Sequence, residues 1–184
     1  DALEFTELLA ALDGMPKPTI ARVHGPAYGG GVGIVTACDI ALGTPEAAFS
    51  FSEVRLGLIP AMISPYAVAA IGERHARRYM LTAERIDAAE ALRIGLLHAA
   101  CPADELDAAI GRIVANTLKG GPASIAACKR VIGRVAHGPI DQATRDYTAR
   151  EIAGIRASAE GKEGIGAFLD KRAPAWVLPG KGAK

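Results

Sequence analysis

Two kinds of residue within the stretch 24–58 have the chemistry of an active site. Three consecutive glycines, Gly29, Gly30 and Gly31, lie at a predicted strand-to-helix junction, and Glu53 follows them among apolar neighbours. Glycine has no β-carbon, so a reacting group can lie close to its backbone N–H. A carboxylate in apolar surroundings is a candidate general acid or base. Together these residues predict chemistry on a carbonyl compound.

Each of these residues also has a simpler interpretation. The glycine run fits a tight turn that allows close packing, and Glu53 fits an exposed strand-end carboxylate paired with Arg55. The glycines do not match GxGxxG, and no GK[ST] motif is present, so these nucleotide-binding motifs are excluded. The four histidines show neither metal-ligand spacing nor a GxSxG elbow. A zinc enzyme or serine hydrolase is therefore not expected.

Composition and charge narrow the function classes further. The 184 residues are 50% hydrophobic, enough for one domain or one domain with a short appendage. The net charge of +1 gives no reason to expect a nucleic-acid partner. Arg74, Arg77 and Arg78 share one helical stretch, for which a solvated or subunit-facing surface is favoured over a phosphate contact. We leave this group unassigned.

The cysteines and the termini bear on the compartment. The three cysteines are far apart and odd in number, which favours a reducing compartment, so a cytoplasmic location is expected. No apolar run is long enough to cross a bilayer, and no membrane partner is expected. The first residue is Asp rather than Met, which suggests a fragment or a trimmed product.

Apolar periodicity predicts an α/β first half and a mostly helical second half. Pro26 is predicted to turn the chain after the first strand, and Pro122 and Pro139 to begin helices. Asp87, with Glu90 three residues later, resembles a capping box. The expected helices are 2–12, 30–38, 67–71, 74–81, 88–94, 106–118, 123–135 and 140–155, and the expected strands are 19–24, 40–42, 48–51 and 96–101.

Four ordered segments resemble one family. They are KPTIARVHGPAYGGGVGIVTACDIAL, FSFSEVRLGLIP, LTAERIDAAEALRIGLLHAACPADEL and EGKEGIGAFLDKRAPAW, and they extend from Lys17 to Trp176. They resemble the enoyl-CoA hydratase/isomerase (crotonase) superfamily. The resemblance implies an α/β fold, with a ββα spiral core over 1–118 that is truncated at its N-terminus. A helical C-terminal region over 119–184 would assemble homotrimers, commonly paired into hexamers.

The resemblance also implies a substrate and a way of binding it. Members bind acyl-CoA thioesters and hold the thioester carbonyl between two backbone N–H groups, which stabilise an enolate. The second donor corresponds to Gly30, beside Gly29, whereas the first belongs to an N-terminal part that this chain lacks. Phe168 and Lys171 match positions that contact the adenine and phosphates of CoA, often from a neighbouring subunit. No metal and no separate cofactor are expected, because CoA enters as part of the substrate.

One residue departs from the family pattern. Hydratases of the family carry two glutamates, of which the second corresponds to Glu53, while the first is replaced here by Gly33. The main hypothesis is hydration of a 2-enoyl-CoA with Glu53 as the acid/base. A single carboxylate could instead move a proton between C2 and C4, as a Δ3,Δ2-enoyl-CoA isomerase does. A non-catalytic acyl-CoA-binding scaffold is the hypothesis of another class.

A narrower resemblance concerns the substrate. The stretch SEVRLGLIPAMISPY is most similar to a bacterial branch of methylglutaconyl-CoA hydratases, which act in leucine and terpenoid breakdown. It suggests a branched or glutaconyl-type acyl group.

Overall fold

The computed structural model describes residues 1–177. Contacts within the chain divide it into two compact units, the first spanning Asp1–Arg112 and the second beginning at Ile113. Helix α5 (Ala103–Thr117) crosses this boundary. The two units are described separately below.

The first unit is built on two small sheets to which the chain contributes strands in turn. One sheet has the order β1-β3-β6 and is parallel, and the other has the order β2-β4-β5, with β5 antiparallel to β4. The first two passages of the chain each add one strand to each sheet before a helical segment follows, as in a ββα spiral, whereas in the third passage α4 lies between β5 and β6. The strands are β1 (Ile20–Val23), β2 (Pro26–Tyr28), β3 (Ile40–Gly43), β4 (Ala48–Ser50), β5 (Ile86–Asp87) and β6 (Ala99–Ala100).

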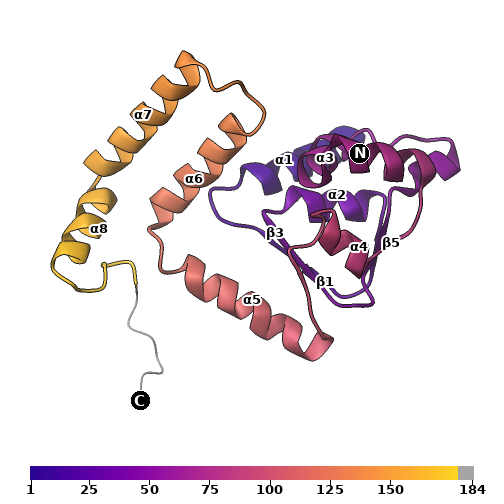
Figure 1. Cartoon of the computed structure of the whole chain (residues 1–184), viewed down its shortest axis with the longest axis horizontal. Helices are drawn as coiled ribbons and strands as arrows, with labels where there is room; N and C mark the ends of the chain where they lie inside the picture. The colour runs from indigo at the N-terminus through magenta and orange to yellow at the C-terminus, as the bar shows by residue number, and fades with distance from the viewer. Residues whose placement is uncertain (178–184) are drawn as a thin grey trace. The chain divides into compact units, whose positions relative to one another are not determined.

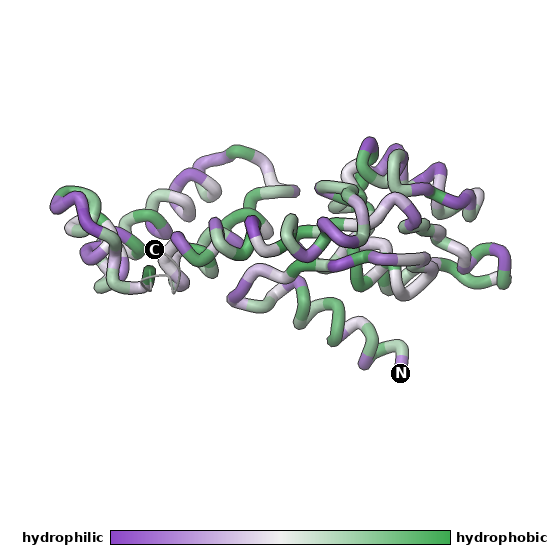
Figure 2. Tube along the Cα trace, turned by 90° about the horizontal axis from the view of Figure 1, so that it is seen from below, coloured by the Kyte–Doolittle hydropathy of each residue, from purple (hydrophilic) through white to green (hydrophobic). Residues whose placement is uncertain are grey.

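Helix α2 lies at the centre of this unit. It packs against α1, α3, β1 and β2, and Figure 1 shows α1, α2 and α3 together beside the strands. Its Val32 is fully buried among Leu9, Phe49 and Phe51, which form the core with other apolar side chains. Figure 2 shows α1 as mostly hydrophobic along its length. The helical elements are α1 (Ala2–Gly14), α2 (Gly30–Ala37), the 3₁₀ helix η1 (Ser52–Leu56), α3 (Ser64–Thr82) and α4 (Ala88–Arg93).

The predicted elements are found with small shifts in their ends, apart from a few differences. Pro26 begins strand β2 instead of turning the chain. The stretches 67–71 and 74–81 belong to one helix, α3, interrupted at Gly72, where φ is 74° and ψ is 157°. Asp87 caps α4 by accepting from the Glu90 N–H at 2.8 Å, as predicted, but the Glu90 carboxylate accepts from Tyr79 and Arg93 and does not complete the capping box. Pro139 precedes α7, which begins after the N-cap Asp141, so that prediction was wrong.

In the second unit, a side chain of one helix caps the N-terminus of another. Its elements after α5 are α6 (Pro122–Val135), α7 (Gln142–Ala157) and α8 (Ala159–Leu169). Glu160 of α8 accepts hydrogen bonds from the N–H groups of Ala123 (2.9 Å) and Ser124 (2.8 Å) at the start of α6. Burial opposes the charged form, but these hydrogen bonds outweigh it and lower the pKa of Glu160. The carboxylate replaces the side-chain cap that Gly121 cannot provide.

Replacing Glu160 with alanine is expected to destabilise the second unit. The change removes the acceptor of two backbone N–H groups at a helix N-terminus, a loss of about 1 kcal/mol in free energy of unfolding. Urea unfolding of the Glu160→Ala variant measures it. Glu46→Ala, at an exposed carboxylate of the first unit, is the control and should change little. Equal stability of the two variants would show that the cap contributes nothing.

Candidate active site

The glycine run forms the junction between β2 and α2. Gly29 has φ 52° and ψ −120°, a conformation that favours glycine, and its N–H donates to the Ser50 carbonyl at 3.0 Å. Its own carbonyl accepts from the N–H of Val32 at 3.0 Å and of Gly33 at 3.3 Å. Gly30 is the first residue of α2 and is exposed, and its N–H has no acceptor among residues 1–177. This N–H is one of the unpaired donors that every helix presents at its start.

Glu53 lies beside this junction. It belongs to η1, which ends at Gly57 with φ 72°, and its backbone carbonyl accepts from the N–H of Leu58 at 3.0 Å. Its Oε1 lies 3.4 Å from the position that a β-carbon on Gly29 would occupy. Its Oε2 is buried and has no hydrogen-bond partner among the described residues. A buried, unpaired acceptor next to a free backbone donor is an arrangement that a bound ligand can complete.

The position of Gly33 is closed to any side chain. A β-carbon there would lie 2.2 Å from Cγ2 and 2.9 Å from Cβ of Ile63, which is only 2% exposed. Ile63 therefore occupies the space that a carboxylate at position 33 would need. Within residues 1–177, the carboxylate beside the glycine junction is therefore that of Glu53, which remains a candidate acid/base.

Phe5 packs against the candidate site at Gly30, and sequence reasoning did not identify it. Its Cζ lies 3.2 Å from the β-carbon position of Gly30, so α1 places an aromatic ring against the start of α2. Phe5 and Ile63 were both missed as site residues. Phe5 stood out only as one apolar position of a helix, and no pattern in the sequence pointed to Ile63.

The two residues expected to contact CoA lie in the second unit. Phe168, near the end of α8, is 81% exposed. Lys171 is exposed and has φ 53°, and its N–H donates to the Phe168 carbonyl at 3.2 Å. The structure thus brings Gly29, Gly30 and Glu53 together and places Phe168 and Lys171 near each other.

The segment after Lys171 is held by a carboxylate. Glu163 accepts from both terminal nitrogens of Arg172, at 2.6 and 2.9 Å, and from the Ala175 N–H at 2.9 Å. The Arg172 hydrogen bonds, followed by that of Ala175, lower the pKa of Glu163 from 4.5 to about 2. Trp176 donates from Nε1 to the Lys119 carbonyl at 3.1 Å. These contacts fix the turn that presents Lys171.

Stability of the second unit is expected to fall as the pH drops from about 4.5 to about 2. The folded-state pKa of Glu163 is lower than the ordinary value, so its contribution is complete above that value and is lost as the folded carboxylate becomes protonated. Thermal unfolding of the native chain and of Glu163→Gln between pH 2 and 6 measures this. The difference between the two should shrink toward the acid end, and a constant difference would contradict the assignment.

Comparison with known proteins decides the family. The sequence description of the family named Enoyl-CoA hydratase/isomerase matches residues 2–178. The chain belongs to this family. An enoyl-CoA hydratase of Alternaria alternata is 37% identical over 169 residues, which cover 90% of this chain and 56% of the relative. The prediction from the four segments is confirmed at the level of the family.

Solved structures of the family share the fold. An enoyl-CoA hydratase from Shewanella pealeana is 47% identical, with a TM-score of 0.92 over 95% of this chain and 65% of that one. An enoyl-CoA hydratase/isomerase from Marinobacter aquaeolei is 33% identical, with a TM-score of 0.90 over 96% of this chain and 67% of that one. The crotonase-type α/β fold with a helical C-terminal part is therefore confirmed.

The match covers only part of the length of each relative. The chain spans between about half and two thirds of the length of the relatives described above. Among residues 1–177, no helix is both long enough and apolar enough to cross a membrane.

Proposed function

We propose that this chain carries part of the active site of an enoyl-CoA hydratase, which adds water to a 2-enoyl-CoA. The observation that supports this most strongly is the buried, unpaired Oε2 of Glu53 beside the glycine junction. The free N–H of Gly30 would donate to the thioester oxygen. Phe5 and Ile63 would form apolar walls that limit the access of bulk water.

In the proposed reaction Glu53 acts twice. The water oxygen bonds to C3 while Glu53 takes a proton from the water, and the C2=C3 electrons move to give an enolate at the thioester. The Gly30 N–H stabilises the negative charge on that oxygen. Glu53 then returns a proton to C2 as the carbonyl reforms, which gives the 3-hydroxyacyl-CoA.

An isomerase is the second candidate, and the packing at Gly33 favours it. Because Ile63 fills the space beside Gly33, no second carboxylate can share the proton transfers from that position. One carboxylate suffices to remove a proton from C2 of a 3-enoyl-CoA and deliver it to C4, which moves the double bond into conjugation. Both candidates use the same Gly30 donor.

The CoA end of the substrate is assigned to the second unit. Phe168 would offer an apolar face to the adenine, and Lys171 a point charge to the phosphates. A branched or glutaconyl-type acyl group and a homotrimeric or hexameric assembly are the finer parts of this proposal.

A thioester panel tests the proposal in the natural polypeptide. Short, branched and glutaconyl-type 2-enoyl-CoAs are offered, and loss of the enoyl-thioester absorbance is followed. Hydration predicts that the absorbance falls. A 3-enoyl-CoA is offered separately, and isomerisation predicts that its absorbance rises as the double bond moves into conjugation. Tight binding of CoA by calorimetry without turnover of any member would contradict catalysis and indicate a binding scaffold.

A further inference from the structure

A hollow on the surface of the first unit is lined mostly by basic side chains. Its volume is about 550 Å³, and none of its described lining residues is acidic. All but one of these residues come from α3, where the spacing 74, 77, 78 and 81 places side chains on one face of the helix. The lining consists of Arg74, His75, Arg77, Arg78, Leu81, Thr82 and Arg93.

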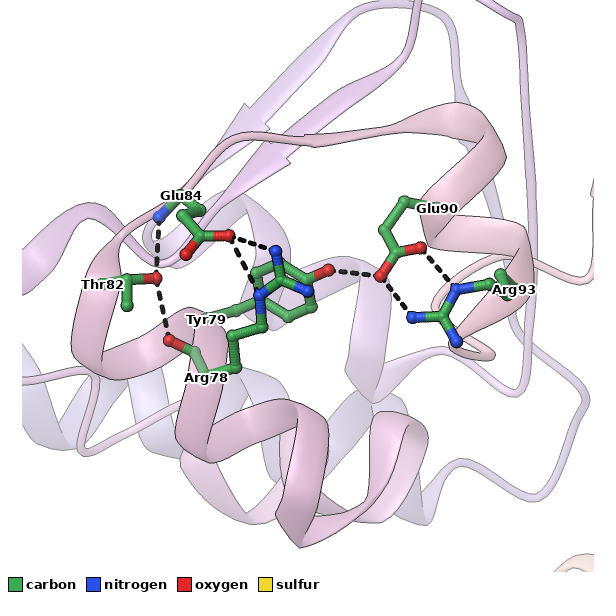
Figure 3. A network of polar contacts seen from close by, with 6 residues as sticks. All are labelled: Arg78, Tyr79, Thr82, Glu84, Glu90 and Arg93. Carbon is green, nitrogen blue, oxygen red and sulfur yellow. Dashed lines mark hydrogen bonds and ion pairs between the residues drawn. The ribbon is translucent and has the colours of Figure 1, made fainter.

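Carboxylates hold two of these arginines in position (Figure 3). Arg78 donates from Nε and Nη2 to Glu84 Oε2, at 3.0 and 2.7 Å. Arg93 donates from Nε and Nη2 to the two oxygens of Glu90, both at 2.6 Å. Glu90 also accepts from the hydroxyl of Tyr79, which is 2% exposed, so this pair is tied to the core. The guanidinium groups are therefore preorganised.

The arginines keep donors and charge that these pairs do not use. A guanidinium has five N–H donors, and Arg77 uses only Nε, toward Glu73 at 2.8 Å. Arg74 forms no ion pair within the described part of the chain. The hollow thus has four arginines and only three carboxylates paired with them, so a net positive charge remains there. Ion pairing alone does not account for Arg74.

We infer that this hollow binds a small molecule bearing phosphate groups. Guanidinium groups match phosphate oxygens through paired N–H donors, which makes arginine suited to this recognition. The volume lies within the range of small-molecule sites. Leu81, 72% exposed, adds an apolar edge for the rest of the ligand. This inference concerns residues other than Glu53 and Gly30, and it does not depend on the proposed function.

Inorganic pyrophosphate is the probe, and calorimetry at low salt is the measurement. The native chain should bind it saturably, and the Arg74→Gln/Arg77→Gln variant should bind about tenfold more weakly or worse, a loss of about 1.4 kcal/mol. Binding should also weaken as salt is added, because these charges face solvent. Circular dichroism verifies that the variant is folded.

The matched control is Arg112→Gln, which removes one exposed arginine of the same unit away from the hollow. It should leave pyrophosphate binding unchanged. No saturable binding, or equal binding by the native chain and the double variant, would overturn the inference. Tighter binding of hexaglutamate than of pyrophosphate would overturn it in favour of an acidic protein partner.

A second titration asks which natural molecule supplies the phosphate groups. Pyrophosphate is titrated again with CoA present at saturation. Competition would identify the phosphates of CoA as the natural occupants, and unchanged binding would identify a second phosphorylated ligand. Either result supports a phosphate site at the hollow.

Discussion

Glu53→Gln is expected to lower kcat by about 10²- to 10⁴-fold, the usual contribution of general acid–base catalysis. Glutamine is nearly isosteric with glutamate, but its amide cannot accept a proton from water or return one to C2. Because the Oε2 of Glu53 has no partner within residues 1–177, no ion pair is broken by the change. The measurement is the rate at which the native and variant polypeptides change the enoyl-thioester absorbance.

The matched control for this prediction is Glu46→Gln. Glu46 is an exposed carboxylate of the same unit, and its replacement should leave kcat unchanged. Binding of a saturated acyl-CoA should be retained by both variants, since Glu53 is assigned to proton transfer. Near-native activity in Glu53→Gln would remove Glu53 from the mechanism.

Gly33→Ala is expected to destabilise the chain by about 1–3 kcal/mol, the usual cost of overpacking a core. The added β-carbon would meet Cγ2 of Ile63 at 2.2 Å, so Ile63 or the backbone of α2 must move. Glutamate at this position should be less stable still. The measurement is the free energy of unfolding in urea.

Two further variants separate this clash from a general effect of alanine. Ile63→Ala alone should cost about 2–5 kcal/mol, because it leaves a cavity. The double variant Gly33→Ala/Ile63→Ala should lose less stability than the sum of the losses in the two single variants, and the difference should be about 0.5–3 kcal/mol. Gly154→Ala, in α7 with open space around it, should stabilise the chain by about 0.4–1 kcal/mol. A Gly33→Ala variant as stable as Gly154→Ala would show that Ile63 does not close this position.

Local patterns were enough to predict most of the spiral core. The uncharged stretch of small and apolar residues predicted α2, and its first residue, Gly30, was predicted correctly. Pro26 was taken for a turn, yet β2 is an edge strand of its sheet and Pro26 is its first residue, where proline is tolerated. Gly72 divided the predicted helix in two, but the chain continues as α3 after a local break.

The candidate site depends on long-range contacts that no local pattern reports. Tyr28 is paired with Ser50 across β2 and β4, and this register brings Gly29 beside Glu53. Ile63 reaches Gly33 because α3 packs on α2, and the sequence alone does not specify that packing. The sequence named Gly29, Gly30 and Glu53 as candidates, and their roles are part of the proposal, whereas no local pattern pointed to Phe5 or Ile63.

The most direct test of the site is the carbon-13 resonance of a bound thioester carbonyl. A saturated acyl-CoA labelled at that carbon is added to the native polypeptide and to Glu53→Gln, since neither can hydrate it. If the Gly30 N–H donates to the thioester oxygen, the resonance should move downfield on binding, and by the same amount in both proteins. A bound carbonyl that keeps its frequency in free solution would contradict the assignment of Gly30 as the donor.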